Sequence, residues 1–126
     1  MIHGSWFVYM LAKKFKLPIQ GSLKNKKALK FLKGGYFHFK IFENKLNYSR
    51  FGVIISNKIS KKSFLRNKLK RIIFEKIRLE KFHLKPNRDC LIIVLPEIAK
   101  NFPITPFIKR EIIKNLEINL KKFIYN

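Results

Sequence analysis

Residues 58–81 read KISKKSFLRNKLKRIIFEKIRLEK, and within this basic run the apolar residues recur with the period of an α-helix. At about 100° per residue, the aliphatic side chains gather on one broad face. These are Leu65, Leu69, Ile72, Ile73, Ile77 and Leu79. The opposite face holds Asn67, Lys70, Arg71, Phe74, Arg78 and Lys81, with Arg66 and Lys68 on its flanks. The pattern predicts a helix that is buried on one side and carries fixed positive charge on the other.

The composition of the polar face favours a polyanionic ligand. Within residues 58–81 only Glu75 and Glu80 are acidic, whereas an ordinary exposed helix mixes both signs to form i,i+4 pairs. Phe74 falls in the middle of the cationic face, where exposure is costly unless a flat group stacks on the ring. The alternative interpretation is the solvated lysine face of an ordinary amphipathic helix. We interpret the segment as a nucleic-acid-docking helix.

The composition of the whole chain allows one folded domain with a polyanionic partner. The chain has 126 residues, enough for a single domain, and 47% of them are apolar, so a core can form. The formal net charge is +22, from 29 Lys and Arg against 7 Asp and Glu. Self-repulsion on that scale destabilises a compact monomer, which is why we expect a polyanion to bind.

The single cysteine, Cys90, lies in the apolar run CLIIVL, which predicts a buried thiol in a reducing compartment. No segment approaches the run of about 18 apolar residues that spans a membrane, so we expect a cytoplasmic protein with no membrane partner. We expect residues 1–21 to form an N-terminal extension, in which Met10 is a possible true start. Residues 22–126 are expected to form one RNA-binding α/β domain.

Upstream of the basic helix the patterning predicts strands. Residues 51–56 are nearly all apolar, which is typical of a strand that is central in a sheet. Residues 36–42 alternate, with Phe37, Phe39 and Ile41 on one side, and this period of two predicts a half-covered strand. Earlier still, Ser22 is expected to cap a short helix over residues 22–33 that ends at the two glycines 34–35.

Downstream, the basic helix is expected to begin at a cap formed by Ser63 and to end before Pro86. Residues 90–95 predict a third strand, and Thr105 followed by Pro106 marks the start of a last helix. The core stripe of that helix is predicted to be Ile112, Ile113, Leu116, Leu120 and Phe123. The resulting fold class is α+β, a two-layer α–β sandwich with the sheet against the helices.

The residues that could carry chemistry are dispersed. His3, His38 and His83 are far apart, and none has a partner at metal-ligand spacing. The seven carboxylates are scattered, most of them beside lysines, and no two form an obvious acid–base or Mg²⁺ pair. We therefore expect no catalytic residue, no bound metal and no small-molecule substrate in this chain.

A second candidate surface lies around the predicted strand 36–42. Aromatic residues there stand close to cations, an arrangement that stacks unpaired bases while neutralising their backbone. The residues concerned are Phe31, Tyr36, Phe37 and Phe39 with Lys33, Lys40 and Arg50. The alternative is that these phenylalanines belong to the core.

Residues 51–78, FGVIISNKISKKSFLRNKLKRIIFEKIR, resemble the signature of the bacterial ribonuclease P protein component. In that family a strand ends in a Ser-Lys-Lys-like turn and leads into a helix that opens Arg-Asn-Arg-x-Lys-Arg. The matching residues are Arg66, Asn67, Lys70, Arg71, Glu75 and Arg78. Three positions depart from the pattern: Lys68 replaces the third motif Arg, Phe74 the Arg before Glu, and Asn57 the first Lys of the turn.

The resemblance implies a four-stranded sheet with three helices and a left-handed βαβ crossover, in which the fourth strand would lie between Gly35 and Arg50. It also implies that the RNA subunit is the catalyst, with Mg²⁺ held mainly on RNA, and that it releases the 5′ leader of precursor tRNA. The partners would be ribonuclease P RNA and precursor tRNA. A ribosomal-protein-like structural RNA-binding protein is the alternative function, and an independent nuclease a weaker one.

The resemblance assigns two sets of site residues. The residues expected to contact the catalytic RNA are Lys58, Lys61, Lys62, Arg66, Asn67, Lys68, Lys70, Arg71, Phe74 and Arg78. Those expected to line the cleft for the single-stranded leader are Phe31, Phe37, Phe39, Lys40 and Arg50.

Overall fold

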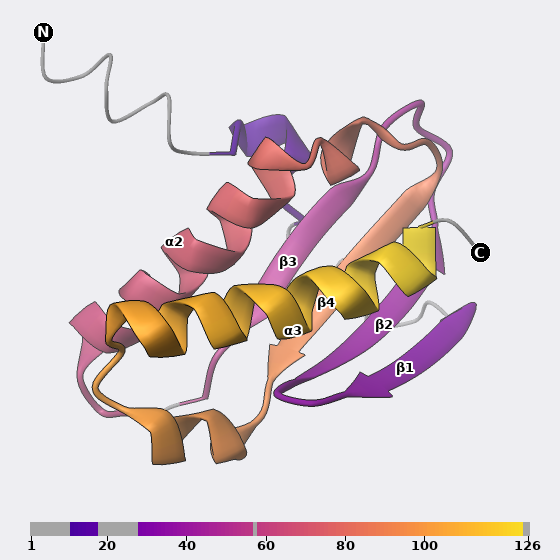
Figure 1. Ribbon diagram of the computed structural model, residues 1–126. Helices are drawn as coiled ribbons and strands as arrows, with labels where there is room; N and C mark the ends of the chain where they lie inside the picture. Colours follow the sequence, from indigo (N-terminus) through magenta and orange to yellow (C-terminus); the bar gives the residue numbers. More distant parts are fainter. Residues whose placement is uncertain (1–10, 18–27, 57, 125–126) are drawn as a thin grey trace, which may run out of the picture.

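The computed structural model describes residues 11–17, 28–56 and 58–124. Four strands form one sheet: β1 (Lys30–Gly34), β2 (Phe37–Glu43), β3 (Arg50–Ile54) and β4 (Arg88–Val94). Two long helices, α2 (Ser63–Leu79) and α3 (Pro106–Ile124), cross the same face of this sheet (Figure 1). Three short 3₁₀ turns complete the described chain: η1 (Lys13–Phe15), η2 (Phe82–Leu84) and η3 (Pro96–Asn101). The predicted α+β sandwich is confirmed.

The strand order is β1-β2-β4-β3, so β4 is the central strand between β2 and β3. Strand β4 runs antiparallel to β2 and parallel to β3. A parallel neighbour requires a crossover connection, and α2 supplies it between β3 and β4. This is the predicted βαβ unit, and it places the basic helix along β3, at one side of the sheet (Figure 1).

The sheet presents alternate residues of each strand to the helices, as the period of two requires. The residues of this helix-facing side are Phe37, Phe39, Ile41, Phe51, Val53, Cys90, Ile92 and Val94, all in the buried core. Leu69, Ile73 and Ile77 of α2 meet them with no exposed surface, and so do Ile112, Leu116 and Leu120 of α3. Burial also raises the pKa of the Cys90 thiol well above its usual range.

The prediction for residues 22–33 is wrong over its described C-terminal end. Residues 30–34 form β1, the fourth strand, which was expected after Gly35 instead. Each β1 residue has a partner in β2, from Lys30 opposite Ile41 to Gly34 opposite Phe37. Hydrogen bonding along this hairpin outweighs the local helix propensity of the lysine-rich segment. Residues 22–27 of the expected helix lie outside the described residues.

The glycines 34–35, predicted as a helix stop, form the hairpin turn instead. Gly35 has a φ of +47°, a conformation that favours glycine. The turn also packs under α3, because a Cβ atom at Gly34 would collide with the Asn119 side chain. The Asn115 Oδ1 accepts the Tyr36 backbone N–H at 3.2 Å, which anchors the turn to the helix.

Of the two predicted helix caps, the one at Thr105 is present and the one at Ser63 is not. Thr105 does cap α3, since its Oγ1 accepts the Ile108 N–H at 3.2 Å, and Pro106 is the first helical residue. Ser63 does not cap α2: it is already helical, and the N-cap residue is Lys62, without a side-chain bond. Helix α2 ends at Leu79, before Pro86 as predicted.

Leu79 is 58% exposed, contrary to expectation, because it lines a shallow groove between α2 and α3 rather than reaching the sheet.

Residues 11–17 belong to the folded domain, although they were assigned to an N-terminal extension. Leu11 and Phe15 are part of the core cluster. Lys16 forms a β-bridge with Phe51, and the Leu17 N–H donates to the Phe51 carbonyl at 2.9 Å. The domain therefore includes this segment, upstream of the boundary expected at residue 22. Residues 1–10 lie outside the described part of the chain.

Candidate nucleic-acid interface

The turn 58–62 and the outer side of α2 form one cationic surface, which we call the basic surface. It consists of Lys58, Lys61, Lys62, Arg66, Asn67, Lys68, Lys70, Arg71 and Arg78. All are exposed except Arg66 and Arg78, which are half-buried. The aliphatic residues Leu69, Ile72, Ile73 and Ile77 lie on the opposite side and are buried. The predicted two-sided helix is confirmed.

Several side chains hold the basic surface in a fixed shape. The Arg66 Nη1 donates to the Ser60 carbonyl at 2.6 Å, which ties the turn to the helix. The Ser60 Oγ accepts the Lys62 N–H at 3.1 Å, a local bond that shapes the same turn. The Lys68 Nζ donates to the Ile104 carbonyl at 3.3 Å and so joins the first turns of α2 to the segment before α3. Arg66 and Lys68 thus also have a structural role.

The described ion pairs leave the basic surface out. They are formed by Arg50, Lys76 and Lys121, none of which belongs to it. Glu75 is the one acid within α2, four positions after Arg71 and three before Arg78. Further acids stand just after α2, on η3 or on α3: Glu80, Glu97, Glu111 and Glu117. Hydrogen bonds from Lys121 and Lys76 lower the pKa of Glu117. The basic surface therefore keeps a large excess of positive charge, with Glu75 as the one acid on its helix.

Arg78 lies where α2 meets η1 and η2. Its Nε atom is buried and has no hydrogen-bond partner among the described residues, and the same is true of the His83 Nδ1. The His83 ring packs edge-on to Phe15 with centroids 4.5 Å apart. Burial lowers the pKa of His83, and the positive charges of Arg78 and Lys14 lower it further. A hydrogen bond to the Ile77 backbone raises the pKa but does not offset these effects. Arg78 of α2 and Lys14 of η1 thus converge beside His83 at this end of the basic surface.

Phe74 does not stand free on the cationic face. The ring is half-buried and packs against the core, with the Lys16 Nζ 5.1 Å from its centroid. The Lys16 side chain lies beside the ring, which helical periodicity cannot show, and the RNA contact expected of Phe74 stays a prediction. Phe64 is the exposed aromatic residue of α2 instead, at 62% exposure. Its position two residues after the lysine pair 61–62 was the sequence feature that could have indicated an exposed aromatic residue on the basic surface.

The face of the sheet turned away from α2 and α3 carries a second set of candidate residues. The register places Phe31, Lys40 and Arg50 on this face, on β1, β2 and β3 respectively. Phe31 is 46% exposed, and its ring meets the His38 ring edge-on at 5.3 Å. The Lys33 Nζ lies 5.8 Å from the Phe31 centroid. Aromatic and cationic groups therefore do meet on one face of the sheet.

Phe37 and Phe39 do not belong to that face. Both are fully buried under the helices, which contradicts their predicted place in an open cleft. The alternation along β2 separated two sets of side chains correctly, but the aromatic set is the one that the helices cover. His38, which the cleft prediction left out, lies on the face of Phe31 instead.

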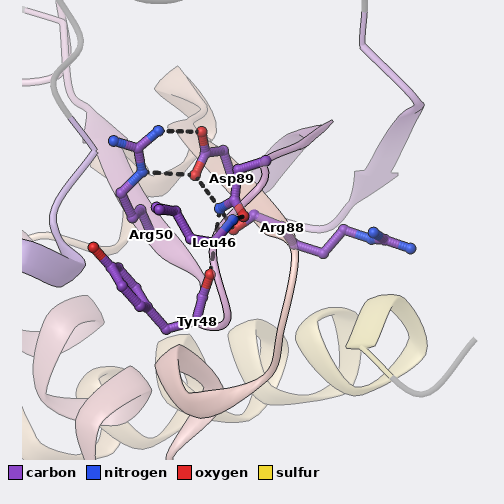
Figure 2. Close-up of polar contacts among 6 residues, drawn as sticks. Leu46, Tyr48, Arg50, Arg88 and Asp89 are labelled. Atoms are coloured by element: carbon purple, nitrogen blue, oxygen red, sulfur yellow. Dashed lines mark hydrogen bonds and ion pairs between the residues drawn. The ribbon is translucent and has the colours of Figure 1, made fainter.

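Arg50 is held by a buried carboxylate (Figure 2). Its Nε donates to Asp89 Oδ1 at 2.9 Å and its Nη2 to Asp89 Oδ2 at 2.7 Å. The Asn44 Nδ2 also donates to Asp89 Oδ1, at 2.8 Å, and Asn44 further binds the backbone of Leu46, Tyr48 and Arg88 (Figure 2). The two hydrogen bonds to Asp89 hold Arg50 at the start of β3. Because the carboxylate offsets its charge, Arg50 adds little net positive potential.

The described residues offer no metal centre and no membrane span. Within the ranges 11–17, 28–56 and 58–124, no three His, Cys, Asp or Glu side chains lie close enough to hold an ion. Both Asp89 oxygens are already occupied by Arg50 and Asn44. A search of the described helices finds none with the length and apolar character to cross a bilayer.

Comparison with known proteins assigns the family. The family model for ribonuclease P matches residues 24–117, well over half of the chain. The chain belongs to the ribonuclease P protein component family. A ribonuclease P protein component of Fusobacterium nucleatum is 40% identical over 68 residues, 54% of this chain and 60% of that protein. One from Synechocystis is 44% identical over 55 residues, 44% of each chain. The matched stretches thus span about half the length of these two relatives.

The structure of the RNase P protein from Thermotoga maritima is similar to this one. It is 30% identical, covers 73% of this chain and 83% of its own, and superimposes with a TM-score of 0.63. Coverage of 73% of the chain is far more than the 17 residues of α2. The resemblance read from residues 51–78 is confirmed at the level of the family.

The His83 environment predicts a pH-dependent stability. A depressed pKa means that the unfolded chain takes up a proton below the ordinary His value of 6.5 while the folded chain does not. We expect the free energy of unfolding to fall as the pH drops below that value. The fall should be smaller than about 1.4 kcal/mol per pH unit, the value for a full difference of one bound proton, because the ring is partly solvated.

Urea denaturation at several pH values between neutrality and 5 measures this effect, in a range where most carboxylates stay ionised. The matched control is His83→Asn, which lacks the titrating group and should show a flatter profile. Parallel profiles for the two proteins would contradict the assignment to His83.

Proposed function

We propose that this chain is the protein subunit of ribonuclease P, which binds the catalytic RNA and the 5′ leader of precursor tRNA to support tRNA 5′-end maturation. One observation carries the proposal: a member of this family presents a basic surface, without a described ion pair, on a helix whose other side is locked into the core. The reducing environment that suits the free Cys90 fits a cytoplasmic location.

The catalytic RNA would dock on the basic surface. Exposed lysine and arginine side chains neutralise phosphates and release their condensed counterions, which supplies affinity without sequence specificity. Arg66 and Lys68 are already oriented by hydrogen bonds to the backbone of Ser60 and Ile104, so little side-chain entropy is lost at those positions on binding.

The leader would lie across the sheet face that carries Phe31, His38 and Lys40. An exposed ring can stack on an unpaired base, and the adjacent Lys33 and Lys40 can neutralise its phosphates. The two binding surfaces are built from different sides of one sheet, since α2 covers the side that Phe31 does not occupy. Catalytic RNA and leader can therefore be bound at the same time.

Hydrolysis would be the work of the RNA. The described residues provide neither a general acid–base pair nor a set of metal ligands, so they fit no protein-bound Mg²⁺ and we assign the ions to the RNA. Mg²⁺ bound there would supply the activated water and stabilise the developing charge. The protein would contribute affinity for the catalytic RNA and positioning of the substrate.

Reconstitution tests the proposed function. We expect the purified protein to restore precursor tRNA cleavage by a bacterial ribonuclease P RNA at a low Mg²⁺ concentration at which the RNA alone is inactive. Cleavage by the protein without RNA would show an independent nuclease. Tight binding to ribosomal RNA with no stimulation of cleavage would favour a ribosomal-protein-like role.

Salt dependence tests the basic surface. If about five phosphates are neutralised, the logarithm of affinity should fall with the logarithm of salt concentration at a slope near −4. Lys70→Ala with Arg71→Ala should make the slope shallower by about 1.5 to 2, because two exposed cations are lost. These positions are preferred to Arg66, whose loss would also release the turn.

Filter binding over a series of KCl concentrations gives the slope directly. The control pair is Lys114→Ala with Lys122→Ala, which removes the same charge from exposed positions on α3. Equal slopes for both double variants would mean that α2 is not the docking element.

Leader binding tests the second surface. Phe31→Ala should weaken binding of precursor tRNA to the reconstituted holoenzyme about fivefold or more, because one stacked base is worth about 1–3 kcal/mol. Mature tRNA, which has no leader, should bind as before. Equilibrium affinities for the two RNAs are compared, with Leu84→Ala, an exposed apolar residue on η2, as the control. An equal loss for both RNAs would exclude a leader contact.

A further inference from the structure

We infer that Phe64 is a stacking anchor for an unpaired base of the RNA that docks on the basic surface, an inference that rests on the proposed function. The position is not one of the charged residues to which the family pattern assigns RNA contacts. It adds an apolar, charge-independent contact to a surface otherwise described by its cations.

Phe64 is exposed to an extent that needs a reason. Its side chain is 62% accessible, the highest value among the exposed large apolar side chains of the described residues. Leu79, by contrast, lines the groove between α2 and α3 with Ile72 and Ile113. Phe64 instead stands in the first turn of α2, one position after Ser63 and three before Asn67.

The immediate surroundings of the ring are cationic. The Lys62 Nζ lies 5.9 Å from the ring centroid, within the distance of a cation–π contact. Lys58, Lys61 and Lys68 are exposed nearby along the chain, and residues 58–74 include no acid. A purely apolar protein partner would have to desolvate these ammonium groups, at a cost that the burial of one ring does not offset. A nucleotide offers a flat base for the ring and phosphates for the lysines.

The ring is presented on a rigid support. The turn before it is tied to the helix by the Arg66–Ser60 bond, and Lys68 fastens the next turn of α2 to Ile104. The starts of α2 and α3 consequently lie side by side at one end of the helical layer (Figure 1). A side chain held in this way loses little conformational entropy on stacking, and the base it meets is fixed relative to Asn67 and Lys70.

The test separates stacking from charge. We expect Phe64→Leu, which keeps an apolar side chain without the aromatic face, to lower the affinity for a bacterial ribonuclease P RNA by about fivefold to a hundredfold. Phe64→Trp should bind at least as tightly as the native protein. Neither variant should change the salt slope by more than a few tenths, because no charge is removed.

The matched control is Ile118→Ala, an exposed apolar residue on α3 that borders the hollow with Glu97 and Glu111. It should leave RNA affinity unchanged. Native RNA affinity in Phe64→Leu would overturn the stacking role, and so would an equal loss of affinity in Phe64→Leu and Phe64→Trp. Either result would leave the proposed function intact. Failure of the native protein to bind this RNA or to stimulate cleavage would instead remove the proposed function itself.

Discussion

The structure depends on burying the aliphatic side of α2 against the central strands. Leu69, Ile73 and Ile77 have no exposed surface, and burying each of them is worth about 1.5–3 kcal/mol. An exposed ion pair contributes about 1 kcal/mol or less, so the apolar side fixes the rotation of the helix about its axis and the charged side follows. The direction in which Asn67, Lys70 and Arg71 point is therefore set by the core and not by electrostatics.

The placement of the few acidic residues helps to explain how a chain of net charge +22 stays folded. Its few acids are placed where they compensate charge inside the protein: Asp89 binds Arg50, and Glu117 bridges Lys76 of α2 and Lys121 of α3. The basic surface is left without such compensation. Its repulsion is a cost to the free protein that a bound polyanion would relieve, so the RNA binding that we propose would also stabilise the fold.

The sequence predicted those parts of the fold that rest on local periodicity. The basic helix, the strands around Phe39, Val53 and Ile92, and the Thr105 cap follow from spacing within single segments. It failed where the outcome depends on pairing or packing with another segment. Strand β1 exists because β2, which begins after a two-residue turn, offers it hydrogen bonds that the pattern within residues 22–33 does not show. Phe74 is half-buried because residues 11–17, far from it in sequence, lie beside α2.

In the candidate site, too, local alternation predicts one part of the arrangement and the packing of the helices decides the other. Alternation along β2 separates Phe37 and Phe39 from His38 and Lys40, but it cannot say which set the helices will cover. The covered set is the more apolar one, because α2 and α3 bring aliphatic surface that must be buried. The leader-binding face that we propose can then use only aromatic residues outside the core, such as Phe31 on the edge strand. Edge strands and first helical turns are the positions that can display such rings, and Phe31 and Phe64 occupy one of each.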